Sequence, residues 1–167
     1  MNEPRVGVGI VVRRGGELLL VRRAGPHGSG TWSTPGGHLD FGEEPAVCAA
    51  REAQEETGVA IGPPRLLGIT NDVFEETGKH YITLWFEAEH ESGEAAALAD
   101  DELDAVGWFD EEALPEPLFP PLMNLLAGRT LACAGPATTR SSTGCARRWP
   151  SRSSTRSSSA RPTTSST

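Results

Sequence analysis

The segment that most restricts what this chain can fold into is GGHLDFGEEPAVCAAREAQEETGV, residues 36–59. It follows a loop dense in Gly, Pro and Ser and begins with two adjacent glycines. Its second half predicts a helix over residues 45–57, because Pro45 suits the first helical position and Gly58 can take the left-handed conformation that ends a helix. The segment therefore predicts a glycine loop that leads into a helix.

Three glutamates crowd this predicted helix. Glu52 and Glu56 are four residues apart and share a face, and Glu55 lies three residues after Glu52. Like charges at this spacing destabilise a helix, so an acidic face exposed to solvent is only one interpretation. The other is a site for a hard cation, which prefers carboxylate and carbonyl oxygens. The glycine pair, Arg51 inside the cluster and Glu43 before it favour the cation site. We expect Glu52 and Glu56 on the surface of a cleft.

The other side of the helix carries small residues that can approach a sheet closely. They are Ala46, Val47, Ala49, Ala50 and Ala53. Hydrophobic alternation and turn residues predict strands over residues 6–12, 17–22, 65–74, 80–90 and 105–109, and a second short helix within residues 111–129. Strands before and after a central helix indicate an α/β domain.

The composition changes near residue 130. After Leu131 the sequence contains no Val, Ile, Leu, Met or Phe, which leaves too little apolar surface for a core. We therefore expect a folded domain over residues 3–130 and a disordered, low-complexity Arg/Ser/Thr-rich tail over residues 131–167.

The charge divides at the same place. Seven arginines and no acid follow Gly128, so the first 128 residues hold eight basic and 23 acidic residues. Such an acidic body repels nucleic acid, and we do not expect nucleic acid as a partner, although a basic tail leaves RNA or DNA binding open. A divalent cation is the obvious means of binding a polyanion.

The cysteines and the N-terminus limit the class of protein further. Cys48, Cys133 and Cys145 form no CxxC pair, which argues against a disulfide framework or a zinc site. The apolar run VGVGIVV is seven residues long and is followed by two arginines, so we expect no signal peptide, no membrane span and a cytoplasmic protein.

The segment resembles the Nudix box, G-x5-E-x7-R-E-U-x-E-E-x-G-U, in which U is a bulky aliphatic residue. The residues that match it are Gly37, Glu43, Arg51, Glu52, Glu55, Glu56, Gly58 and Val59. Ala53 stands at a U position, a departure that affects packing rather than chemistry. The sequences GVGIVV, LLLVRR and WFDEEALPEPLF extend the resemblance over about residues 5–128.

The resemblance implies an α/β/α sandwich with a mixed sheet and metal-dependent hydrolysis of a nucleoside diphosphate linked to another group. Mg²⁺ is the implied cofactor, with Mn²⁺ as an alternative, and Glu52, Glu56, Glu55 and a carbonyl near Gly37 are the implied ligands. It also implies that Arg51 orients the acidic residues and that Glu43 supports them. Metal and then substrate phosphate would offset the repulsion among the glutamates.

The sequences PGGHLDFGE, GVGIVV and KHYITLWF resemble the MutT-like Nudix subgroup that splits (deoxy)nucleoside triphosphates into monophosphate and pyrophosphate. This resemblance implies that His38 faces the phosphates; a loop histidine without a role is the alternative. Arg22 and Thr83 are further candidate substrate ligands, whereas we expect Arg23 to be solvated and leave Tyr81 open between core and pocket.

Several alternatives remain at this level. The substrate could instead be ADP-ribose or another nucleotide derivative, or the chain could be a non-catalytic module that senses a nucleotide, and a homodimer is left open. We predict Glu55 as the general base, with Asp100, Asp101 and Glu102 as the alternative source. Arg51, Glu52, Glu55 and Glu56 are thus the predicted catalytic residues.

Overall fold

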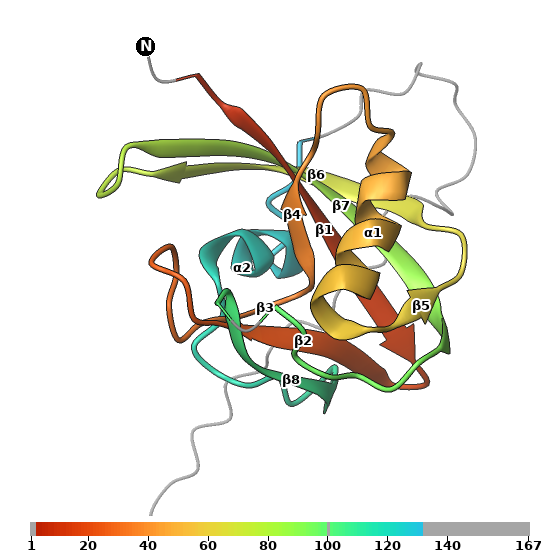
Figure 1. Ribbon diagram of the computed structural model, residues 1–167. Coiled ribbons are helices and arrows are strands. Elements are labelled where there is room, and N and C mark those ends of the chain that lie inside the picture. The colour runs from red at the N-terminus through yellow and green to blue at the C-terminus, as the bar shows by residue number, and fades with distance from the viewer. Residues whose placement is uncertain (1–2, 100, 132–167) are drawn as a thin grey trace, which may run out of the picture.

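The computed structural model describes residues 3–99 and 101–131 (Figure 1). Within these ranges the elements are β1 (Arg5–Arg14), β2 (Glu17–Arg23), β3 (Trp32–Ser33), β4 (Gly36–His38), α1 (Pro45–Thr57), β5 (Ala60–Ile61), β6 (Arg65–Phe74), β7 (Lys79–Ser92), β8 (Leu103–Asp110) and α2 (Pro120–Leu126). No helix in the described ranges is both long and apolar enough to cross a membrane.

The strands form one mixed sheet around β1. This strand runs parallel to β7, with Arg5 opposite Tyr81 and Arg13 opposite Glu89, and antiparallel to β2 and to β4. β6 and β8 extend the sheet as antiparallel partners of β7 and β2. A parallel pair needs a long crossover connection, and α1 lies within the one that joins β1 to β7.

The two helices cover opposite faces of this sheet. Alternate side chains of a strand point to opposite faces. On β1, Val8, Ile10 and Val12 pack in the cluster that contains residues of α1, whereas Val11 packs in the cluster that contains Leu122 of α2. The expected α/β/α sandwich is therefore confirmed.

The helix expected over residues 45–57 is confirmed at both ends. Pro45 opens α1, and Gly58 follows it with φ of 72° and donates its N–H to the carbonyl of Gln54. Cys48, Ala49 and Ala53 are fully buried against the sheet. The expectation for Val47 was wrong, because this side chain is 58% exposed on the outer side of the helix.

The five longer strands match the expected ranges to within a few residues, but three short strands were not expected. They are β3, β4 and β5, with two or three residues each. Strands this short show no alternation that a pattern could detect, and they form because neighbouring strands offer them hydrogen-bond partners. The expected tail lies, apart from Leu131, outside the described residues, and the domain boundary stays a prediction.

Truncation after Leu131 is expected to leave the melting temperature unchanged, because the removed segment contains no large aliphatic residue to bury. Truncation after Gly128 serves as the matched control. It removes the hydrogen bond from the Leu131 N–H to the Ile69 carbonyl (2.8 Å), and a net loss of about 1 kcal/mol should lower the melting temperature by a few degrees. Differential scanning calorimetry of the two truncated proteins and the full chain measures these melting temperatures. A lower melting temperature for the longer truncated protein would move the boundary beyond residue 131.

Candidate active site

Two glycines bring the sheet into contact with the carboxylates of α1. β4 pairs with β1 through Gly36 opposite Gly9 and Gly37 opposite Val8, which places the glycine pair beneath the helix. The N–H of Gly36 donates to Glu56 Oε2 (3.0 Å), and a β carbon on Gly37 would overlap the Glu52 carboxylate. Glycine at position 37 therefore makes room for a carboxylate that lies against the backbone.

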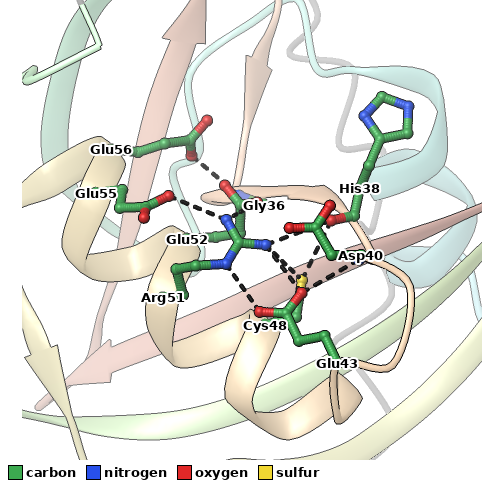
Figure 2. A network of polar contacts seen from close by, with 9 residues as sticks. All are labelled: Gly36, His38, Asp40, Glu43, Cys48, Arg51, Glu52, Glu55 and Glu56. Atoms are coloured by element: carbon green, nitrogen blue, oxygen red, sulfur yellow. Dashed lines mark hydrogen bonds and ion pairs between the residues drawn. The ribbon is translucent and has the colours of Figure 1, made fainter.

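Arg51 joins three of the four Nudix-box glutamates (Figure 2). Its Nε and Nη2 donate to the two carboxylate oxygens of Glu43 at 2.8 and 3.1 Å, a bidentate arrangement. Its Nη1 donates to Glu52 Oε1 at 2.8 Å and to Glu55 Oε2 at 3.0 Å. The guanidinium thus offsets the repulsion that neighbouring carboxylates would otherwise exert on the helix.

This arrangement separates the acidic residues by their pKa values. The hydrogen bonds from Arg51 lower the pKa of Glu43 to about 2, so this carboxylate is ionised at all physiological pH values. Burial raises the pKa of Glu56 to about 7, an increase that the Gly36 N–H only partly opposes. Burial also raises the pKa of Glu52, against the charge of Arg51.

Exposure differs among the three helix glutamates. The Glu55 side chain is 60% exposed, whereas Glu52 and Glu56 are 9% and 6% exposed. Glu52 and Glu56, which were expected on the surface of a cleft, are therefore largely buried. Buried carboxylates need a partner, and each has one: Arg51 for Glu52 and the Gly36 N–H for Glu56.

The donor set suits a hard divalent cation. Three carboxylates and the carbonyls of a glycine turn are the ligands that Mg²⁺ and Mn²⁺ prefer, and the missing β carbon at Gly37 lets the Glu52 carboxylate lie against that turn. Within the described ranges, no three His, Cys, Asp or Glu side chains converge as a ready-made ligand set. Arg51 holds Glu52 and Glu55 in this arrangement, so a cation would have to compete with the guanidinium for both.

Comparison with known proteins agrees with this geometry. The NUDIX domain family model matches residues 3–127, most of the chain. The chain belongs to the Nudix family. A solved relative, the MutT NUDIX hydrolase from Burkholderia pseudomallei, superposes with a TM-score of 0.72 and 32% identity over 75% of this chain and 98% of that chain.

Relatives with curated names differ in what those names describe. A MutT-like protein of Streptomyces ambofaciens is 35% identical over 108 residues, 65% of this chain and 64% of that protein. The NAD-capped RNA hydrolase NudC of Pseudomonas aeruginosa PAO1 is 37% identical over 108 residues, 64% of this chain but 36% of that protein. The 8-oxo-dGTP diphosphatase of Escherichia coli K12 is 32% identical over 87 residues, 52% of this chain and 65% of that protein. The chain spans less than two thirds of each of these three.

The backbone and the ring of His38, which follows the Nudix-box glycine Gly37, point in different directions. Its carbonyl accepts hydrogen bonds from Cys48 Sγ (3.5 Å) and Arg51 Nη2 (3.4 Å). Its exposed ring points away from the carboxylates (Figure 2) and lies 5.7 Å from the ring of Tyr81. The imidazole is therefore available to a ligand, and its contact with phosphate stays a prediction.

Thr83 already has a protein partner. Its hydroxyl donates to Asp72 Oδ2 (2.8 Å), and Asp72 also accepts hydrogen bonds from Thr70 (2.7 Å) and Asn124 (2.8 Å). Asp72 is 2% exposed, so this network lies inside the protein. Thr83 thus supports the sheet beside Gly7 and Gly37, which does not favour its predicted contact with substrate.

The structure reverses the expectation for the two arginines at the end of β2. Arg22 is exposed and pairs with Asp104 (2.9 Å), which does not support its predicted contact with substrate. Arg23 was expected to be solvated, but it is partly buried; burial lowers its pKa, and the charge of Glu56 only partly opposes this. The extra residue at the register shift between β2 and β8 lies in β8, because Arg22 pairs with Ala105 and Arg23 with Leu103. The alternation of β2 is therefore uninterrupted, and it places Arg23 on the face of the buried Leu19 and Val21.

The alternative source of a base lies within electrostatic range of the site. The charge of Glu102 contributes to raising the pKa of both Glu52 and Glu56. The Glu102 backbone is fixed by a hydrogen bond from its N–H to the Ala99 carbonyl (2.9 Å), and its side chain is exposed. Asp101 is also exposed, and Asp100 lies outside the described residues.

The raised pKa of Glu56 predicts how stability depends on pH. Its ordinary value is 4.5 and its folded value is about 7, so the folded state binds the proton more tightly. Stability of the metal-free protein should therefore fall as pH rises from about 4.5 to about 7, by up to about 3 kcal/mol. Glu52 contributes in the same direction. Melting temperatures in EDTA across this range measure the slope.

Glu56→Gln should remove most of that slope, because the amide is neutral throughout. Glu76→Gln, at an exposed position in the β6–β7 turn, should keep it. Saturating Mg²⁺ should raise the melting temperature most at the alkaline end, where the carboxylates are ionised. If the melting temperature of the metal-free wild type does not change between pH 4.5 and 7, burial of Glu56 does not destabilise the fold as predicted.

Proposed function

We propose that this protein is a divalent-metal-dependent hydrolase of nucleotide pyrophosphate bonds, with a (deoxy)nucleoside triphosphate as substrate and a monophosphate and pyrophosphate as products. The observation that carries the proposal is the arrangement of Glu52 and Glu56, which lie buried against a glycine turn while Arg51 ties Glu52 to Glu43 and Glu55. A helix face that served only solubility would expose its charges.

Each residue of the cluster has a distinct part in this proposal. Glu52, Glu55 and Glu56 would hold Mg²⁺ together with a carbonyl near Gly37. When bound, such a cation neutralises phosphate charge and acidifies the attacking water. Arg51, anchored by its two bonds to Glu43, keeps the carboxylates oriented. Arg23 supplies positive charge on the side of Glu56, where a phosphate oxygen can accept its hydrogen bonds.

The water attacks phosphorus and the anhydride P–O bond breaks, while the water's proton passes to a carboxylate. Glu55 is the exposed member of the cluster and already lies within the site, which supports it as the base. Glu102 is the alternative, because its charge acts on Glu52 and Glu56 from outside the helix.

Relatives support more than one substrate. The E. coli relative is named for 8-oxo-dGTP, which favours a nucleoside triphosphate, and the Pseudomonas relative is named for NAD-capped RNA, which favours a dinucleotide pyrophosphate. The SQPWPFPxS segment expected of the second class is absent from this sequence, and Val73 stands where an ADP-ribose enzyme would be expected to carry proline. A non-catalytic sensor is disfavoured because all of the box glutamates are present and arranged together.

The direct test is a hydrolysis screen with Mg²⁺ over nucleoside triphosphates, oxidised nucleotides, NAD, ADP-ribose and dinucleoside polyphosphates. Release of pyrophosphate from a triphosphate, as the fastest reaction, is the expected result. Faster cleavage of NAD would assign the second substrate class, and no cleavage of any of these would favour the sensor.

Glu52→Gln and Glu56→Gln are each expected to lower kcat by roughly a thousandfold, because loss of a metal ligand removes several kcal/mol of transition-state stabilisation. Neither should unfold the protein, since the amide fills the same space and no longer carries a buried charge. Glu76→Gln is the matched control and should keep full activity. Either variant with near wild-type turnover in Mg²⁺ would remove that residue from the metal site.

The base is identified by pH–rate profiles of Glu55→Gln and Glu102→Gln. If Glu55 accepts the proton, its variant should lose both the acidic limb of the profile and roughly a hundredfold or more of the rate. Glu102→Gln should then retain the limb and most of the rate. The reverse pattern would place the base in the segment before β8.

A further inference from the structure

Three aromatic rings surround the imidazole of His27. The ring centroid of His27 lies 4.5 Å from Phe74, 5.7 Å from Tyr81 and 5.5 Å from Phe119. Phe74 comes from β6, Tyr81 from β7, and Phe119 directly precedes α2. We call these three rings the aromatic cage. His27 enters it from the loop over residues 24–31, which lies on the same side of the molecule as α2 and the β6–β7 hairpin (Figure 1).

The aromatic cage adjoins the carboxylate site. The ring of His38, which follows the Nudix glycine Gly37, lies 5.7 Å from that of Tyr81. The guanidinium of Arg23 lies 4.6 Å from the ring of Phe119, a cation–π distance, and is near enough to Glu56 for that charge to oppose the lowering of its pKa by burial. A molecule with its phosphates at the carboxylates and a ring in the aromatic cage would therefore lie alongside Arg23.

No hydrogen bond within the described residues explains why His27 is in the cage. Its Nε2 is buried and has no partner there. Burial, followed by the charges of Lys79, Arg23 and His38, lowers the pKa of His27, so the ring is neutral. Buried polar atoms are normally satisfied, and an imidazole held only by ring contacts can be exchanged for another ring.

The loop that carries His27 is attached through Arg23. Arg23 Nε donates to the His27 carbonyl (2.9 Å), and the Arg23 backbone pairs with Thr31 (2.9 Å) and Gly30 (2.7 Å) at the base of the loop. Gly28, at φ of +78°, lies on the ring of Phe119, where a β carbon would come within 2.6 Å. The contacts of Arg23 and Gly28 thus hold the loop that places His27 in the cage.

We infer that the aromatic cage binds the planar nitrogen heterocycle of the substrate, and that His27 occupies it in the free protein as an internal competitor that the ring displaces. Imidazole is itself a planar nitrogen heterocycle, so the ring already in the cage is of the same kind as the ring that we infer to bind there. Stacking on aromatic side chains tolerates any base, which leaves the identity of the base open to other contacts. This inference rests on the proposed function, since it assigns a place to the nucleotide's ring.

An internal competitor lowers the apparent affinity by the fraction of molecules in which the cage is open. His27→Ala in the full chain is therefore expected to lower the Kd for deoxyguanosine monophosphate, roughly tenfold, by titration calorimetry. The Kd for pyrophosphate, which has no ring, should not change. The matched control is His90→Ala: His90 also meets an aromatic ring, Trp108 at 5.3 Å, but lies outside the cage, and its loss should change neither Kd.

An unchanged or higher Kd for the monophosphate in His27→Ala would overturn the inference, because His27 would then be a wall of the site. If the wild type hydrolyses nucleoside triphosphates in that case, the proposed function stands and only this inference fails. If the wild type neither hydrolyses nor binds any nucleotide, both fail.

A second measurement uses the unmutated protein. The ring protons of His27 should resonate upfield of ordinary histidine positions, since three aromatic rings surround them, and the His27→Ala spectrum assigns them. Saturating deoxyguanosine monophosphate should return these signals toward ordinary positions, whereas pyrophosphate should leave the ring in the cage. His27 signals that stay upfield with the monophosphate bound would overturn the displacement.

Discussion

The site depends on one guanidinium. Arg51 stands among acidic side chains that would otherwise repel one another, and its planar shape lets it bond Glu43 through two atoms while a third reaches Glu52 and Glu55. A lysine has one charged nitrogen and could not hold this set in a fixed geometry. Arg51 also stays anchored if a cation binds Glu52 and Glu55, because its two hydrogen bonds to Glu43 are separate from those it makes to these carboxylates.

Arg51 can hold these carboxylates in place only because Gly36 and Gly37, beneath them in β4, have no side chains. Gly36 lies so close to the backbone of β1 at Val8 that a β carbon would overlap it, and a β carbon on Gly37 would overlap the Glu52 carboxylate. These close approaches let β4, three residues long, lie flat enough for Glu52 and Glu56 to reach it. The glycines of β4 thus let the carboxylates of α1 lie against the sheet, and this close approach buries Glu52 and Glu56.

The regular elements could be predicted because their patterns are local. The bounds of α1 follow from Pro45 and Gly58, and the β6 range follows from its apolar run and the polar turn after it. The pairing of Arg51 with the box acids came from family resemblance, and the structure shows the same contacts. Tertiary facts were not accessible: the burial of Glu56 depends on how closely β4 approaches, and the partial burial of Arg23 depends on the His27 loop and the Phe119 ring that pack against it.

The same reasoning explains why Asp72 gave no signal. In the sequence it is one acid in a polar stretch of β6, and only the fold brings Thr83 of β7 and Asn124 of α2 to its two oxygens. The neutral side chains of Thr70, Thr83 and Asn124 supply its hydrogen bonds inside the protein.

The burial that makes Glu56 costly for folding is also what suits it to bind a cation. A carboxylate that has lost its water and keeps only one backbone N–H is destabilised as an anion, which the pKa of about 7 expresses. A divalent cation removes that penalty, so part of its binding energy offsets a cost that folding had already incurred. Arg51 does the opposite for Glu43, which it holds ionised with a pKa of about 2. The cluster therefore contains one acid held ionised by Arg51 and another that is destabilised as an anion, and the second is the one that we propose as a metal ligand.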